Sequence, residues 1–103
     1  MFARRIAVVG TGYVGLTTGA CLASLGHHVI CADVDEEKIR RLQDGKVDIL
    51  EPGLSELVAE GLAAGRLAFT VGAAVAVEQP AEGVEVVFLC VPTPMGVGGV
   101  ADL

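Results

Sequence analysis

The sequence predicts an α/β protein built on a doubly wound parallel sheet, with helices on both faces in a three-layer α/β/α arrangement. Short apolar runs of strand length alternate with longer stretches of helical periodicity, which is the pattern of β-α units in a parallel sheet. The first strand is expected at 5–9, and its apolar run, Ile6 to Val9, is unbroken, as a central strand covered on both faces requires. A glycine-rich turn joins that run to the first helical stretch.

The elements follow from periodicity and from their stop signals. Small residues in the first helical stretch, 14–25, allow close approach to the sheet, and Gly26 ends it. A second apolar run at 28–32 forms the next strand. The remaining elements are, in order, a helix capped by Asp35 and running through Leu42, a loop at 44–53, a helix from Leu54 to a stop at Gly65, a strand at 67–71, a helix at 72–78 and an apolar strand at 84–91.

The turn Gly10-Thr11-Gly12-Tyr13-Val14-Gly15 matches G-x-G-x-x-G between a strand and a helix, the context of a dinucleotide phosphate site. Gly10 allows the turn, Gly12 lets a pyrophosphate approach the backbone, and Gly15 lets helix and strand pack closely. The helix directs its N–H groups and positive dipole end at the phosphates. We therefore expect an NAD-binding, Rossmann-type sheet of order 3-2-1-4, with the candidate pyrophosphate residues Gly10, Thr11, Gly12, Tyr13, Val14 and Gly15.

Asp33 is the candidate ribose-binding acid. It ends the second strand, 18 residues beyond Gly15, close to the roughly 20-residue spacing at which an acid binds the adenosine ribose. An acid here also repels a 2′-phosphate, so NAD is favoured over NADP; the alternative is that Asp33 only opens a turn. Lys38 is within reach of the adenosine end of the cofactor, although a solvated lysine is the ordinary interpretation.

Thr93 is the last candidate cofactor contact along the chain. It follows the strand 84–91, whose carboxyl end faces the glycine turn across the crevice of a 3-2-1-4 sheet. Pro92 and Pro94 hold the backbone extended on either side of it. The alternative is a strand exit that prolines merely stiffen.

Composition excludes several classes of function. The net charge is −6 and no long basic run occurs, so we expect no nucleic-acid partner. His27 and His28 lack further ligands at metal spacing, and no apolar stretch has the length of a membrane span. The three cysteines, an odd number, all lie in apolar segments: Cys21, Cys31 and Cys90. This predicts buried thiols in a cytoplasmic protein.

The chain resembles the N-terminal domain of the UDP-glucose/GDP-mannose dehydrogenase family along almost its whole length. The resemblance rests on motifs that occur in the family's order. They are Gly10-Thr11-Gly12-Tyr13-Val14-Gly15-Leu16, Asp33-Val34-Asp35, Glu51-Pro52-Gly53-Leu54, Gly65-Arg66-Leu67, Val91-Pro92-Thr93-Pro94-Met95-Gly96 and Ala101-Asp102-Leu103.

The resemblance implies an NAD-dependent, four-electron oxidation of a nucleotide-sugar C6 alcohol to a uronic acid, through an aldehyde and a cysteine thioester. It assigns the pyrophosphate to 10–15, the adenosine ribose to Asp33 and Lys38, a cofactor contact to Thr93, and a place near the substrate to 51–54. Relatives continue well beyond Leu103, and their catalytic cysteine lies in that continuation. We therefore expect no catalytic residue in this chain.

Residues 1–103 are thus expected to form a partial N-terminal NAD-binding domain, inactive alone, whose full-length enzyme takes a nucleotide sugar as substrate. UDP-glucose, GDP-mannose and UDP-N-acetyl sugars all stay open. The apolar fourth strand at a sheet edge predicts a homo-oligomer, most simply a dimer, or aggregation. Two other classes stay open: a stand-alone NAD-binding module, and a domain of another NAD-dependent oxidoreductase.

Overall fold

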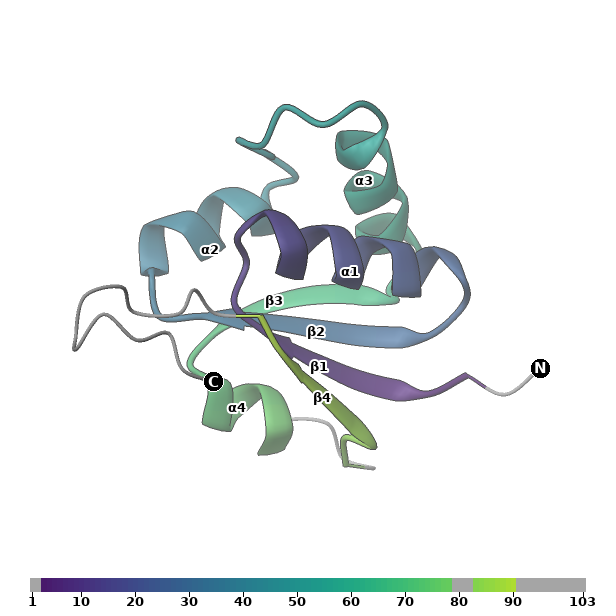
Figure 1. The fold of residues 1–103 in the computed structure, drawn as a ribbon, viewed down its shortest axis with the longest axis vertical. Coiled ribbons are helices and arrows are strands. Elements are labelled where there is room, and N and C mark those ends of the chain that lie inside the picture. The colour runs from purple at the N-terminus through teal and green to yellow at the C-terminus, as the bar shows by residue number, and fades with distance from the viewer. Residues whose placement is uncertain (1–2, 79–82, 91–103) are drawn as a thin grey trace, which may run out of the picture.

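The computed structural model describes residues 3–78 and 83–90. Their strands form one parallel sheet in the order β3-β2-β1-β4, as the sequence predicts (Figure 1). In the register, Val8 of β1 lies opposite Cys31 of β2 and Phe88 of β4. The strands are β1 (Arg5–Val9), β2 (His28–Asp33), β3 (Leu67–Val71) and β4 (Val86–Leu89).

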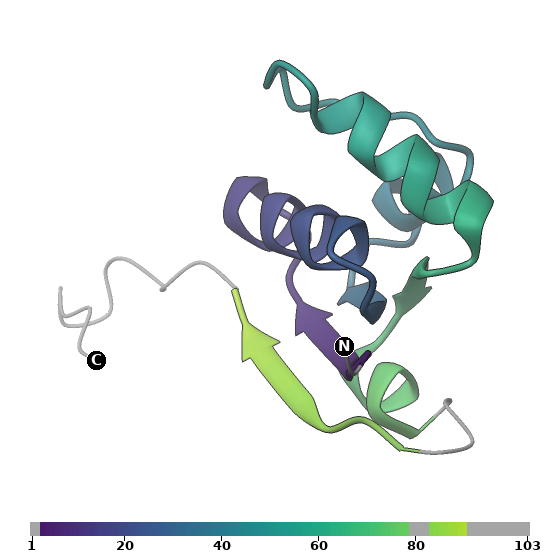
Figure 2. The ribbon, with the colours of Figure 1, turned by 90° about the vertical axis from the view of Figure 1, so that its right-hand side faces the viewer.

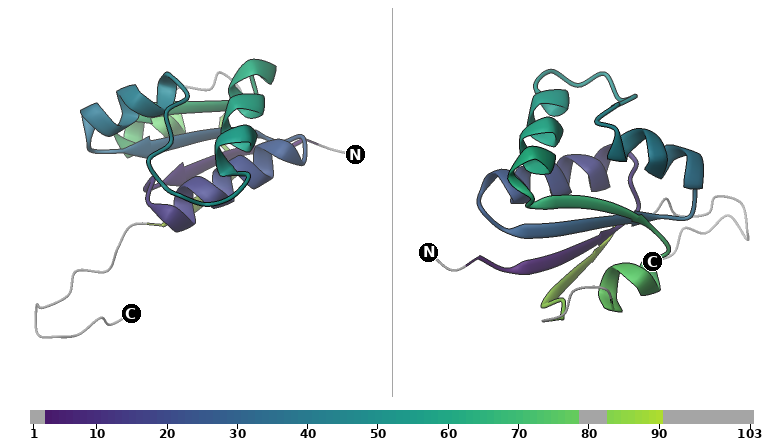
Figure 3. Two further views of the ribbon diagram at one scale, coloured as in Figure 1. Left: turned by 90° about the horizontal axis from the view of Figure 1, so that it is seen from above. Right: turned by 180° about the vertical axis from the view of Figure 1, so that it is seen from behind.

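The helices cover the two faces of the sheet unequally. Figures 1 and 3 show α1, α2 and α3 on one face of the sheet and the short helix α4 on the other. This confirms the three-layer arrangement among the described residues. The first three are α1 (Tyr13–Ser24), α2 (Glu36–Gln43) and α3 (Leu54–Ala64), and the opposite one is α4 (Ala73–Glu78).

The main core lies between the sheet and helices α1 to α3. Alternate strand residues point to this side, so Val8 and Phe69 pack with Leu16, Ile39 and Val58 from the helices. Glycines bring helix and strand very close. A methyl group at Gly19 would lie 2.6 Å from the Cys31 sulfur, and one at Gly61 would lie 2.8 Å from the Leu67 Cβ.

The opposite face has a much thinner core. Its buried members are Ala7, Ala32 and Ala76, with Ile30 and Val84 partly buried beside them. Because these side chains are small, α4 packs on the sheet through methyl groups.

Strand β4 forms one edge of the sheet, as Figure 2 shows. It hydrogen-bonds to β1, and all four of its side chains are exposed, Leu89 by 75%. Apolar side chains on a strand at a sheet edge are a template for association.

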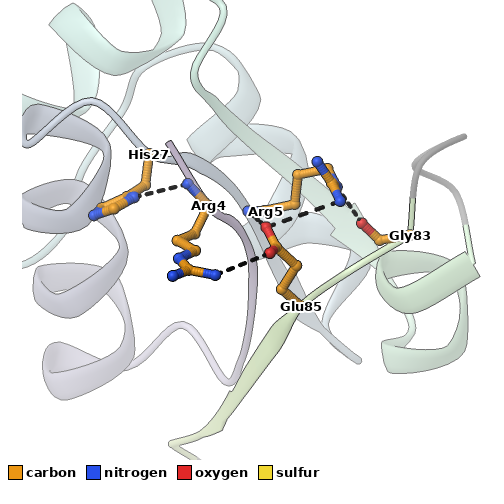
Figure 4. A network of polar contacts seen from close by, with 5 residues as sticks. All are labelled: Arg4, Arg5, His27, Gly83 and Glu85. Carbon is orange, nitrogen blue, oxygen red and sulfur yellow. Dashed lines mark hydrogen bonds and ion pairs between the residues drawn. The ribbon is translucent and has the colours of Figure 1, made fainter. Parts of the chain in front are cut away.

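A polar cluster ties the amino ends of β1 and β4 together (Figure 4). The Glu85 carboxylate accepts from the Arg5 backbone N–H (3.0 Å) and from the Arg4 guanidinium (3.2 Å). The Arg5 side chain donates to the Gly83 carbonyl at 2.6 Å, and the Arg4 N–H donates to His27 Nδ1 at 3.0 Å. The Arg5 N–H is the main reason that the pKa of Glu85 lies below its ordinary value.

Some expectations need correction. The first helix begins and ends one residue earlier than expected, and the second strand includes Asp33. The fourth strand, Val86–Leu89, is shorter than 84–91: Val84 precedes it and packs against the alanine core, and residue 91 lies outside the described residues. Cys21 is exposed and Cys90 only half-buried. Successive residues of a helix point about 100° apart, so Ala20 faces the core and Cys21 does not.

The cysteines should differ sharply in reactivity. Burial, aided by the nearby Cys90, raises the pKa of Cys31 to about 12, and alkylation requires the thiolate. We expect iodoacetamide at pH 8 to modify Cys21 quickly and Cys31 only after unfolding, as peptide mass spectrometry over time would show. Cys21→Ser should remove the fast phase, and a urea-treated sample provides the control. Equal rates at Cys21 and Cys31 in the folded protein would contradict this.

Candidate cofactor site

A cavity of about 450 Å³ opens at the carboxyl ends of β1 and β2. This is where open parallel sheets bind ligands. The turn that follows β1, the end of β2, and the starts of α2 and α4 all contribute to it. Its lining residues are Val9, Gly10, Thr11, Gly12, Asp33, Val34, Lys38 and Ala73.

The glycines of the turn differ in their surroundings. Gly10 has φ +106°, a conformation that side chains strongly disfavour, and its N–H donates to the Ala32 carbonyl at 2.7 Å. A methyl group at Gly15 would collide with the Gly10 carbonyl oxygen. A methyl group at Gly12 would meet nothing within 4 Å. Folding therefore needs Gly10 and Gly15, whereas Gly12 leaves open space that a ligand can occupy.

The start of α1 offers backbone donors beside this cavity. The first N–H groups of a helix have no partner within the helix, and the N-cap Gly12 supplies no side chain to cap them. No acidic residue stands in the first turn, so the positive end of the helix dipole stays uncompensated. Tyr13 and Val14 have exposed side chains (53% and 61%) that do not line the cavity.

The Asp33 carboxylate is held from three directions. Its Oδ2 accepts from the Thr11 N–H at 3.0 Å and from the Thr11 hydroxyl at 2.6 Å. Its Oδ1 accepts from the Asp35 N–H at 3.2 Å. Lys38 Nζ lies 3.7 Å from Oδ2, and the Asp35 side chain fixes the start of this lysine's helix by accepting from the Lys38 N–H. The structure therefore brings Thr11, Asp33 and Lys38 together.

These partners keep Asp33 ionised. Partial burial by itself would raise the pKa of the carboxyl, but the Thr11 and Asp35 hydrogen bonds, with the positive charge of Lys38, outweigh it and lower the pKa. The cavity therefore presents a fixed negative charge near α2 and unpaired N–H groups near α1. That pairing suits a ligand with hydroxyls at one end and phosphates at the other.

Part of the cavity lining was not predicted from the sequence. Val9, Val34 and Ala73 line it but none belongs to the glycine motif. Val34 directly follows Asp33 and was within reach of sequence reasoning, whereas Ala73 enters only through the packing of α4. Thr93, predicted to contact the cofactor, lies outside the described residues.

The loop 51–54 lies elsewhere. Glu51 and Pro52 line a separate shallow hollow of about 350 Å³ together with Val47, Ile49 and Ser55. Leu50, also at its edge, is 98% exposed. Within 3–78 and 83–90, no three His, Cys, Asp or Glu residues gather as a metal site would require. No helix in the same residues is both long and apolar enough to cross a bilayer.

Comparison with known proteins decides the family. A model described as "UDP-glucose/GDP-mannose dehydrogenase family, NAD binding domain" matches residues 4–103. The chain belongs to this family. It is 44% identical over 100 residues to UDP-glucose 6-dehydrogenase TuaD of Bacillus subtilis, a match that covers 97% of this chain and 21% of that protein. A UDP-glucose 6-dehydrogenase of Rhizobium meliloti is 48% identical over 100 residues, with 96% and 22% covered.

Solved structures of the family share the fold. GDP-mannose dehydrogenase from Pseudomonas aeruginosa, solved as a ternary complex, superimposes with a TM-score of 0.82 at 41% identity and covers 93% of this chain. A UDP-glucose dehydrogenase of Pyrobaculum islandicum gives a TM-score of 0.83 at 36% identity and covers 92%. In both cases the match spans 21% of the other chain. The Rossmann-type fold is thereby confirmed, and the chain corresponds to about a fifth of these relatives' length.

The charge on Asp33 should make stability depend on pH. Because its folded pKa lies below the ordinary 3.8, its contribution is present above that value and disappears as pH falls through the folded pKa. Asp33→Asn should therefore lower the free energy of unfolding by about 1 kcal/mol at pH 7, and the difference should shrink toward pH 2. Urea titrations at several pH values measure this. Glu60→Gln, at an exposed position of α3, is the control; a pH-independent gap for Asp33→Asn would refute the assignment.

Proposed function

We propose that this chain is the NAD-binding portion of a nucleotide-sugar 6-dehydrogenase, of the type that converts UDP-glucose to UDP-glucuronate. The observation that carries the proposal is the cavity, where a glycine turn, an uncapped helix start and an ionised aspartate meet. The family match over residues 4–103 supports it. So does the naming of two relatives as UDP-glucose 6-dehydrogenases.

The residues of the cavity fit NAD. We propose that the backbone of 10–15 holds the pyrophosphate, with open space at Gly12 to admit it. Asp33 would accept hydrogen bonds from the adenosine ribose, and Lys38 would donate at the same end. Bound NAD supplies a hydride acceptor at its nicotinamide ring. Thr93 is kept as a proposed contact on family resemblance.

Asp33 also favours NAD over NADP. The carboxylate is ionised and fixed by two Thr11 donors, so a 2′-phosphate placed against it would meet a like charge. Lys38 offsets little of this repulsion, because its ammonium is already paired with that carboxylate at 3.7 Å.

The oxidation itself would need residues beyond those of this chain. The described cysteines are not placed to act as the nucleophile: Cys31 is buried with a raised pKa, Cys90 packs against Gly15, and the exposed Cys21 does not line the cavity. We therefore propose that this chain alone binds NAD without oxidising a nucleotide sugar. A stand-alone NAD-binding module is the second candidate, because the glycine turn, Asp33 and Lys38 meet in one cavity.

A titration calorimetry experiment tests the cofactor proposal. NAD and ADP-ribose should bind with similar affinity, because the contacts lie at the adenosine end, and NADP should bind at least about tenfold more weakly. Gly12→Ala should abolish binding without loss of thermal stability, since its methyl group is accommodated by the fold and obstructs only the pyrophosphate.

Ala59→Gly, at an exposed position of α3 away from the cavity, is the matched control. It should bind NAD as the wild type does. Unchanged NAD affinity in Gly12→Ala, or no heat of binding from a folded wild-type chain, would contradict the proposed phosphate site.

The unpaired cysteines support a cytoplasmic location.

The exposed β4 edge supports a homodimer, and we propose that two copies associate through β4. Val87→Lys, at a position 46% exposed, should shift the protein toward monomer because it places charge on the edge. Light scattering over a concentration series measures this. A monomeric wild-type chain at high concentration would rule the dimer out.

A further inference from the structure

We propose that Thr11 is a positioning residue for ribose recognition: its buried hydroxyl fixes the Asp33 carboxylate so that Oδ1 is the oxygen left to accept from the adenosine ribose. The inference rests on the proposed NAD-binding function and assigns a role to the side chain of Thr11. The glycine motif leaves that position unspecified.

The Thr11 side chain is committed to Asp33. Thr11 is fully buried, and its hydroxyl lies 2.6 Å from Asp33 Oδ2. An ionised carboxylate has no proton to give, so the hydroxyl is the donor. A buried hydroxyl is costly unless it is hydrogen-bonded. Thr11 and Asp33 therefore depend on each other.

The two carboxylate oxygens are unequally occupied. Oδ2 receives both Thr11 donors, which fills the roughly two lone-pair sites of one carboxylate oxygen. Lys38, at 3.7 Å, adds charge from beyond hydrogen-bonding distance. Oδ1 accepts only the Asp35 N–H among the described donors. One acceptor position at Oδ1 thus remains for a ribose hydroxyl.

This occupancy predicts how the ribose diol is bound. A carboxylate with both oxygens available could accept from the 2′- and 3′-hydroxyls together. Here Oδ1 accepts from one ribose hydroxyl. The other hydroxyl must instead accept a hydrogen bond, which Lys38 at the cavity wall can donate. Removal of one particular hydroxyl from the ligand should therefore weaken binding far more than removal of the other.

The hydroxyl of Thr11 can be removed while its shape is kept. Thr11→Val is close to isosteric and leaves only the backbone N–H on Oδ2, so the carboxylate can rotate about its terminal torsion, which is broad. Thr11→Ser retains the hydroxyl. We expect ADP-ribose to bind about tenfold more weakly to Thr11→Val and within about threefold of wild type to Thr11→Ser.

A double-mutant cycle separates positioning from a general structural effect. In the Asp33→Asn background, Thr11→Val should cost no further ADP-ribose affinity, because no carboxylate remains to be positioned. Circular dichroism melts establish that each variant is folded at the titration temperature. Thr11→Ala is the second hydroxyl-free variant and replaces Thr11→Val if that one is unfolded.

A measurement without ligand distinguishes this inference from the proposed function. Carboxyl carbon NMR of the free protein follows the titration of Asp33, whose pKa Thr11 helps to lower. The pKa should rise in Thr11→Val and stay unchanged in Thr11→Ser. If wild type fails to bind ADP-ribose, the cofactor proposal fails, yet the NMR titration still decides the positioning.

Two results would overturn the inference. One is equal weakening of ADP-ribose binding by Thr11→Ser and Thr11→Val. The other is an Asp33 titration that is the same in wild type and Thr11→Val.

Discussion

The contact between Gly10 and Gly15 is the constraint on which the rest of the structure depends. The chain must reverse within a few residues between β1 and α1, and the Gly10 carbonyl ends so close to Gly15 that no side chain fits there. This contact fixes where α1 starts and how near it lies to the sheet. The direction of its first N–H groups follows. Packing at Gly19 against the Cys31 sulfur then fixes the helix along its length.

The same turn connects the fold to the chemistry of the site. Thr11, between the two glycines, is buried because the turn is tight, and burial obliges its hydroxyl to find a partner. That partner is Asp33 at the end of the neighbouring strand. The parallel pairing of β1 with β2 places Val9 opposite Ala32, so the residues that follow each strand meet. Charge and hydrogen bonding at the site are therefore consequences of backbone geometry.

Residues governed by local rules were predictable from sequence. Asp35 caps α2 as its type and position indicate, and Gly65 ends α3 in the left-handed conformation. The glycine motif gave Gly10, Gly12, Gly15 and Asp33 because its spacing encodes a strand, a turn and a helix.

Features that depend on distant packing were not predictable. Exposure of Cys21 follows from the rotation of α1 about its own axis, which an apolar segment of small residues leaves undetermined. Ala73 reaches the cavity because α4 crosses to the far face of the sheet, and the Thr11 bond to Asp33 spans 22 positions.

The alanine core beneath α4 sets the depth of the cavity. Ala7, Ala32 and Ala76 are the buried residues between sheet and helix, and Ala73, one turn before Ala76 on the same helix, forms part of the cavity wall. The distance between α4 and the sheet is thus set by the methyl groups of these alanines. A larger side chain in this layer would lift the helix and widen the cavity near Ala73. The width of the cavity is in this sense set by buried residues that do not line it.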